Sequence, residues 1–64
     1  MILVTRINGA KLMINPDLIE LMEKQADTIV SLTTGNRILV KESLEELSEK
    51  IVQYRRKTHI QAGG

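Results

Sequence analysis

Residues 28–41, TIVSLTTGNRILVK, carry the clearest structural signal in the chain. Two runs rich in β-branched side chains flank Gly35-Asn36. Such runs favour β-strands, and Gly and Asn tolerate the positive φ of a tight turn. Alternate residues of a strand share a face, so the apolar residues within each run point to one side. The stretch predicts an antiparallel hairpin with strands over residues 28–33 and 37–41.

The hydrophobic period changes directly after this hairpin. Four side chains then recur at the spacing of one helical face, namely Leu44, Leu47, Ile51 and Tyr54. Ser43 and Glu46 form a capping box, which satisfies two backbone amides at the start of a helix. Glutamates follow this start and basic residues precede the end, as the helix macrodipole favours. We therefore expect a C-terminal helix that begins at Glu42-Ser43.

The beginning of the chain carries a second hairpin signal. Residues 2–7 are mostly β-branched or aliphatic, and Asn8-Gly9 is a two-residue turn sequence because both positions tolerate positive φ. We expect this first strand to pair with a second strand over residues 11–14. Asn15-Pro16-Asp17 ends the pattern, because Asn caps helices and Pro fits a first helical turn but not the inside of a central strand.

Residues 18–24 fit two structures. Their apolar residues match one helical face, whereas Ile19 and Leu21, with Glu20 between them, match a half-buried strand. The segment is short for a helix and normal for a strand that follows one helical turn. A strand is the preferred interpretation, and a helix stays the alternative.

Together these signals predict an α+β fold. We expect a small, mostly antiparallel sheet or barrel of four to five strands with one C-terminal helix, in the order β-β-β-β-β-α. The alternative order is β-β-α-β-β-α. We expect residues 1–58 to form a single small domain and residues 59–64 to form a disordered tail, because the tail has no periodic apolar pattern.

Composition restricts both the core and the partners. The chain has 64 residues, no Cys, no Trp or Phe and one Tyr, so an aliphatic core must hold a domain near the lower size limit. Association would bury more surface, and we expect a homo-oligomer. The net charge of +1 gives no overall field for nucleic acid, so nucleic-acid binding is not expected. No run is long enough to span a membrane or to form a signal peptide, so the expected location is the cytoplasm.

The chemistry of catalysis is poorly represented. The chain has one histidine, His59, no cysteine, and no glycine-rich loop before a helix. A lone His lacks the second ligand that a metal site needs. The chain is therefore not expected to be an enzyme, to bind a metal or to carry a cofactor.

Arg55, Arg56 and Lys57 form the single basic cluster. With Lys50 and His59 they are suited to contact an acidic protein surface, RNA or the head groups of acidic lipids at a membrane surface. The preferred interpretation is structural, because cations stabilise the last turn of a helix. The three cluster residues remain the candidates for partner contact.

Three motifs occur in a fixed order: MILVTRING at residues 1–9, NPDLIE at residues 15–20 and ADT at residues 26–28. Gly35, Val40 and Glu42-Ser43 follow them. In this order the chain resembles the FlbD or SwrD family of small bacterial flagellar proteins over roughly residues 1–55. Ala26 stands where the family pattern has proline, and the Gly35-Asn36 order also departs from it. The matched residues that we regard as structural or partner-facing are Thr5, Arg6, Asn8, Gly9, Asn15, Pro16, Asp17, Ile19, Glu20, Asp27, Thr28, Gly35 and Glu42.

The resemblance implies a non-catalytic, cytoplasmic accessory of the flagellar base. Such a protein supports motor force and swarming motility through protein contacts with the stator units formed by MotA and MotB. The resemblance identifies neither the contacting surface nor a direct contact.

A second resemblance belongs to a different functional class. The segments MILVTR and LMI, with Gly9 between them, are similar to the start of the CsrA family of small RNA-binding regulators. The similarity ends after residue 15, because the later strand lacks the Gly-x-x-Ala-Pro ending and the His-Arg-Glu-Glu segment of that family. An adaptor module for another partner is the third alternative.

Overall fold

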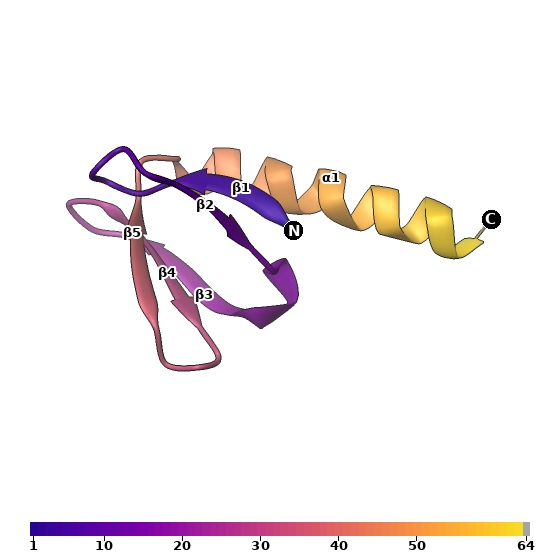
Figure 1. The fold of residues 1–64 in the computed structure, drawn as a ribbon, viewed down its shortest axis with the longest axis horizontal. Coiled ribbons are helices and arrows are strands. Elements are labelled where there is room, and N and C mark those ends of the chain that lie inside the picture. The colour runs from indigo at the N-terminus through magenta and orange to yellow at the C-terminus, as the bar shows by residue number, and fades with distance from the viewer. Residues whose placement is uncertain (64) are drawn as a thin grey trace.

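The chain folds as five strands followed by one helix (Figure 1). The structure is a computed structural model that describes the backbone of residues 1–63 and the side chains of residues 1–57. The expected α+β class and the order β-β-β-β-β-α are confirmed. In chain order the elements are β1 (Ile2–Thr5), β2 (Lys11–Ile14), a 3₁₀ turn (Pro16–Leu18), β3 (Ile19–Lys24), β4 (Thr28–Leu32), β5 (Arg37–Val40) and α1 (Leu44–Gly63).

The helix begins as the sequence predicts. The Ser43 amide donates to Glu46 Oε1 and the Glu46 amide donates to Ser43 Oγ, each over 3.0 Å, so the capping box is confirmed. The assigned helix runs to Gly63, whereas the sequence analysis expected a disordered tail over residues 59–64. Because the side chains of residues 58–64 lie outside the described part, the expected tail and domain boundary stay predictions.

The strands form two antiparallel sheets that meet at one crossing. One sheet contains β1 and β2, and the other has the order β3-β4-β5. An antiparallel bridge between Arg6 and Val40 joins them. On either side of this bridge the Lys41 amide donates to the Thr5 carbonyl at 2.8 Å, and the Ile7 amide donates to the Leu39 carbonyl at 3.2 Å. The end of β1 therefore pairs with β5 as well as with β2.

Both predicted hairpins are present, but their turns are longer than expected. The Arg6 and Leu32 amides donate to the carbonyls of Ala10 and Asn36, each at 2.8 Å, so each loop has three residues. Only the last loop residue has positive φ, +93° at Gly9 and +97° at Gly35. The expectation of positive φ at the asparagines was wrong, because a three-residue hairpin needs one left-handed residue, which glycine supplies at little cost.

The ambiguous segment forms a strand after one helical turn. Pro16 begins the 3₁₀ turn, and the Leu18 amide donates to the Asn15 carbonyl at 3.0 Å. Pairing of β3 with β4 then shifts by one residue between Ile19 and Leu21, which leaves Glu20 as the extra residue of a β-bulge. Pairing with β4 satisfies the backbone and decides between the two periodicities that the sequence left open.

The core is aliphatic and draws on both sheets and the helix. Its buried members are Ile2, Val4, Ile14, Val30, Val40 and Leu47. Leu47 is fully buried, whereas Ile51 and Tyr54 of the same stripe are only half-buried. Figure 1 shows why, since the first turns of α1 lie along the sheets and the helix then runs past them.

Several large apolar side chains remain exposed on the single chain. Among them, Met1 directly precedes β1, Leu3 lies on β1 and Met13 lies on β2, and each is about half exposed, between 45% and 57%. Leu3 and Met13 are cross-strand partners and therefore share the outer face of this hairpin. The expected homo-oligomer would cover such a face, and it stays a prediction.

We expect Leu47→Ala to lower the free energy of unfolding by about 2–4 kcal/mol, because it leaves a cavity where the helix meets both sheets. Val52→Ala is the matched control, since Val52 is 41% exposed on the same helix. It should change stability by less than about 0.5 kcal/mol. Urea denaturation monitored by circular dichroism measures both values. Equal losses in the two variants would show that the helix does not use Leu47 as its core contact.

We expect Gly35→Ala to destabilise the domain by about 1–2 kcal/mol, because an added Cβ disfavours the left-handed backbone at this turn. Nothing lies within 4 Å of the position that a Cβ would occupy, so the cost is conformational and not steric against a neighbour. Gly35→Asn should cost less, since Asn tolerates this conformation. Thermal unfolding of the two variants measures the order, and a neutral Gly35→Ala would contradict the turn geometry.

Candidate functional site

The family-pattern residues Thr5 and Glu42 meet at the crossing of the sheets although 37 positions separate them. The Thr5 amide donates to Glu42 Oε1 at 2.9 Å. The Thr5 hydroxyl also hydrogen-bonds to the Glu42 carboxylate, and it accepts from Lys11 Nζ at 3.0 Å. This contact occurs where β5 ends and the chain turns into α1, so the carboxylate takes the β1 amide that a longer β5 would have paired.

The same contacts change the acidity of Glu42. Partial burial acts to raise its pKa, because a carboxylate loses hydration. Hydrogen bonds from the amide and hydroxyl of Thr5 and from its own amide, together with the charge of Lys50, outweigh burial, so the pKa of Glu42 is lowered. The ionised carboxylate is thus the form that the fold binds.

Four further family-pattern positions build the turns. The Arg6 amide and carbonyl close the first loop, and Gly9 and Gly35 supply its positive φ and that of the last loop. Asn8 Oδ1 accepts from the Ala10 amide at 3.0 Å. The Arg6 side chain is exposed, and its backbone rather than its guanidinium explains its place in the fold.

The Asn15-Pro16-Asp17 motif starts the 3₁₀ turn. Asn15 Oδ1 accepts from the Asp17 amide at 3.0 Å, and Pro16 is buried at the first helical position. The Asp17 carboxylate accepts from Arg55 Nη1 at 3.4 Å, with both side chains 60% exposed. The basic cluster was predicted to stabilise the last turn of the helix, but α1 continues to Gly63, so Arg55 lies within the helix. Its exposed pair with Asp17 joins α1 to the linker between the two sheets.

The remaining family-pattern positions lie on β3, β4 and the loop between them. Ile19 packs against the core, and Thr28 is buried at the start of β4. The Asp27 carbonyl accepts from the Gln25 amide at 3.1 Å, which closes the loop where Ala26 stands. The Glu20 side chain is exposed at the bulge and forms no hydrogen bond or ion pair with another described residue.

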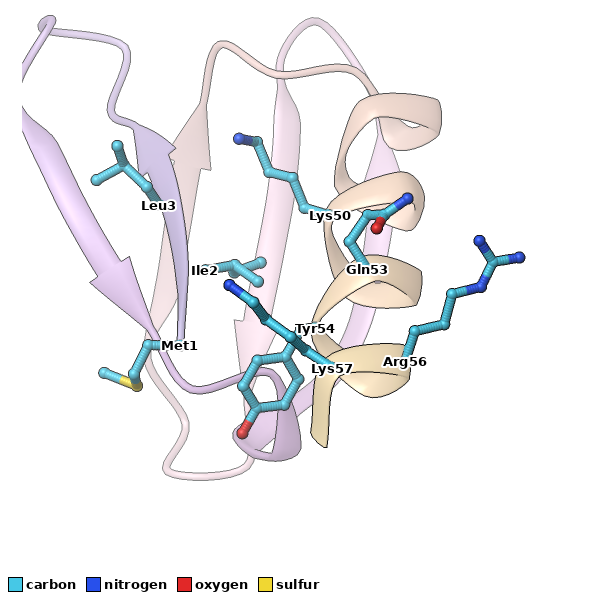
Figure 2. Close-up of a pocket in the computed structure, with 8 residues that line it drawn as sticks. All are labelled: Met1, Ile2, Leu3, Lys50, Gln53, Tyr54, Arg56 and Lys57. Carbon is cyan, nitrogen blue, oxygen red and sulfur yellow. The ribbon is translucent and has the colours of Figure 1, made fainter. Parts of the chain in front are cut away.

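A groove of about 440 Å³ separates the start of β1 from α1 (Figure 2). The eight residues that line it are Met1, Ile2, Leu3, Lys50, Gln53, Tyr54, Arg56 and Lys57. In Figure 2 the ammonium groups of Lys50 and Lys57 extend from the helix toward β1, whereas the Arg56 guanidinium extends away from it. The groove therefore has one wall made by a strand and one wall that carries positive charge.

The structure divides the basic cluster that the sequence grouped together. Arg55 pairs with Asp17, Arg56 lies at the outer rim of the groove, and Lys57 faces β1. Sequence reasoning did not connect Lys50 and Lys57 with the first three residues of the chain. Their spacing of seven residues places them on one helical face, and this spacing could have indicated from the sequence that the two lysines act together. His59 lies outside the described side chains.

Comparison with the sequence patterns of known protein families assigns the chain to a family. The pattern of the FlbD family, described as flagellar and swarming motility proteins, matches residues 1–59. The chain belongs to the FlbD family. The match covers all five strands and most of α1, and it indicates a protein related to flagellar and swarming motility. Comparison with curated proteins and with solved structures gave no significant match.

No helix among the described residues is long and apolar enough to cross a membrane. The described Asp and Glu residues form no group of three that would hold a metal ion.

We expect the stabilising effect of Glu42 to depend on pH. Its pKa in the folded state is lowered from the ordinary value of 4.5, so its contribution to stability is present above that value and is lost as the pH falls through the folded pKa. Glu42→Gln should therefore lower stability near pH 7 by about 1 kcal/mol and have a shrinking effect below about pH 4. Denaturant titrations of the parent chain and the variant at pH 7 and pH 3 measure the difference in the free energy of unfolding.

Glu20→Gln is the matched control for this experiment. It removes the same charge from an exposed side chain that forms no hydrogen bond or ion pair with another described residue. A Glu42→Gln effect that stays constant from pH 7 to pH 3 would contradict the role of the ionised carboxylate.

Proposed function

We propose that this FlbD protein is a non-catalytic accessory of the flagellar motor. It supports the force of the stator units formed by MotA and MotB, and hence swarming, through protein contacts made from the cytoplasm at the flagellar base. The observation that carries the proposal is the family match over residues 1–59.

The use of the family-pattern residues supports action by contact. Most of them serve the fold, because they form turns, cap the 3₁₀ turn or join the two sheets. They do not converge on a shared cavity that holds reactive groups. These residues stabilise the backbone and so hold the surface side chains in fixed positions. Such an arrangement is suited to binding a partner and not to a chemical step.

The basic face of α1 is the candidate surface for this contact. Lys50, Arg56 and Lys57 line the groove beside β1, and Arg55 is held by Asp17 on another side of the helix. The proposal therefore assigns partner contact to Lys50, Arg56 and Lys57 and a structural role to Arg55. Exposed ion pairs contribute little to stability, so loss of the Arg55 pair should cost less than about 1 kcal/mol.

Deletion of the gene tests the proposal in the cell. Filaments should assemble normally while swimming force in viscous medium and swarming fall, and extra copies of the stator genes should restore both. A chromosomal copy that carries Lys50→Gln, Arg56→Gln and Lys57→Gln should fail to complement, whereas Arg55→Gln should complement. Normal force in the deletion strain, or missing filaments, would contradict a role in motor power.

Crosslinking in the native cell tests the class of partner. Recovery of stator protein that survives nuclease treatment supports the proposal. Recovery of RNA without motor protein, with an affinity that falls steeply as salt rises, would instead support the RNA-binding alternative, because phosphate contacts release counterions.

A further inference from the structure

Strand β1 has one paired edge and one edge that is paired only at its end. The Arg6 amide donates to the Ala10 carbonyl on the β2 side. Thr5 faces the other side, because its amide donates to Glu42 Oε1 and its carbonyl accepts from the Lys41 amide. Backbone direction alternates along a strand, so Leu3 presents its amide and carbonyl on the same side as Thr5.

No strand covers Leu3 on that side within the described residues. The pairing with β5 ends at the bridge between Arg6 and Val40, and the chain then turns into α1. The free edge of β1 opens into the groove of about 440 Å³ that the helix borders (Figure 2). A strand edge that no other strand pairs offers a template for an added strand. The outer edge of β2 also has no partner strand, but the residues that line this groove include the start of β1 and none of β2.

The groove also selects for charge. Lys50 and Lys57 reach from one face of α1 toward this edge, and seven residues of helix place their Cα atoms about 10.5 Å apart. None of the described residues that line the groove carries a carboxylate. Glu42 is not among the lining residues; its charge interacts with that of Lys50, and its carboxylate is already engaged by Thr5.

We propose that the groove between β1 and α1 binds an extended acidic segment of a partner protein, which adds as a strand to the Leu3 edge. Its backbone pairs with Leu3, and its carboxylates meet Lys50 and Lys57. Acidic residues two or four positions apart on one face of a strand are separated by about 7 or 13 Å, which brackets the lysine spacing. The proposal rests on the proposed function only in taking the partner to be a protein.

A second copy of the chain fits this groove less well. Pairing of two β1 edges about a twofold axis would bring Lys50 and Lys57 of both copies into one groove. Like charges would then oppose each other where an acidic segment would neutralise them. The exposed side chains of Met1 and Leu3 at the groove give either occupant an apolar contact, so charge decides between the two.

The test is an NMR titration of the ¹⁵N-labelled full chain with a capped heptapeptide that has glutamates at alternate positions and valine or threonine elsewhere. We expect shift changes at residues 1–5 and 50–57, and slower exchange of the Leu3 amide. A peptide with lysine in place of glutamate should not bind. Methylation of the peptide amides that face β1 should also abolish binding, because strand addition needs those donors.

Variants isolate the charge contribution. Lys50→Gln with Lys57→Gln should weaken binding about tenfold at low salt, since two exposed ion pairs are lost. Lys24→Gln with Lys41→Gln is the matched control, because it removes the same charge from exposed positions that do not line the groove. This control should leave the affinity unchanged, and both variants should retain the cooperative unfolding of the parent chain.

Four results would overturn the inference: no binding at millimolar peptide, equal binding of the lysine peptide, equal losses in both variants, or shift changes elsewhere. Protection of Leu3 that rises with protein concentration without peptide would overturn it too, and would identify a second copy as the occupant. The proposed function is tested separately. A motility defect in the deletion strain without peptide binding would support the proposed function and reject the peptide-binding groove. Peptide binding without a motility defect would support the groove and reject the proposed function.

Discussion

The contact of Thr5 with Glu42 and the adjoining Arg6–Val40 bridge hold the two sheets together. Each hairpin is stabilised locally, but a two-stranded hairpin alone is marginal in water. The crossing converts a hairpin and a three-stranded sheet into one framework around a shared core. It also fixes where α1 begins, because Glu42 lies directly before the capping box at Ser43.

The exposed chemistry follows from this constraint. Pairing between β1 and β5 stops at the crossing, since the chain must turn there to enter the helix. The first residues of β1 are then left with an open edge beside α1, and the helix places Lys50 and Lys57 along it. The crossing that joins the two sheets therefore also leaves the start of β1 unpaired beside the groove.

Local signals predicted the fold well. The β-branched runs around Gly35 and the capping box at Ser43 are properties of neighbouring residues, and the structure confirms the elements that they indicate. The strand after Pro16 was ambiguous from periodicity alone, because pairing with β4 decides it. The predicted turn lengths were wrong for a related reason. The pairing register of the two strands determines the number of loop residues, and the dipeptide at the turn does not.

The candidate site was much less accessible to sequence reasoning. Thr5 and Glu42 were known only as separate members of a family pattern, and their contact spans 37 positions. The basic cluster was predicted as a unit, but helical geometry sends Arg55 to Asp17 and Lys57 toward β1. Which side of a helix faces which strand edge depends on tertiary packing, which no local pattern encodes.

Native-state amide exchange of the parent chain and of Glu42→Ala tests the central claim most directly. In the parent chain the Thr5 and Lys41 amides should be protected, because each donates to a partner across the crossing. In Glu42→Ala both should exchange faster, while amides paired within the β3-β4-β5 sheet keep most of their protection. Unprotected Thr5 and Lys41 in the parent chain, or unchanged protection in the variant, would contradict the role of this contact in joining the two sheets.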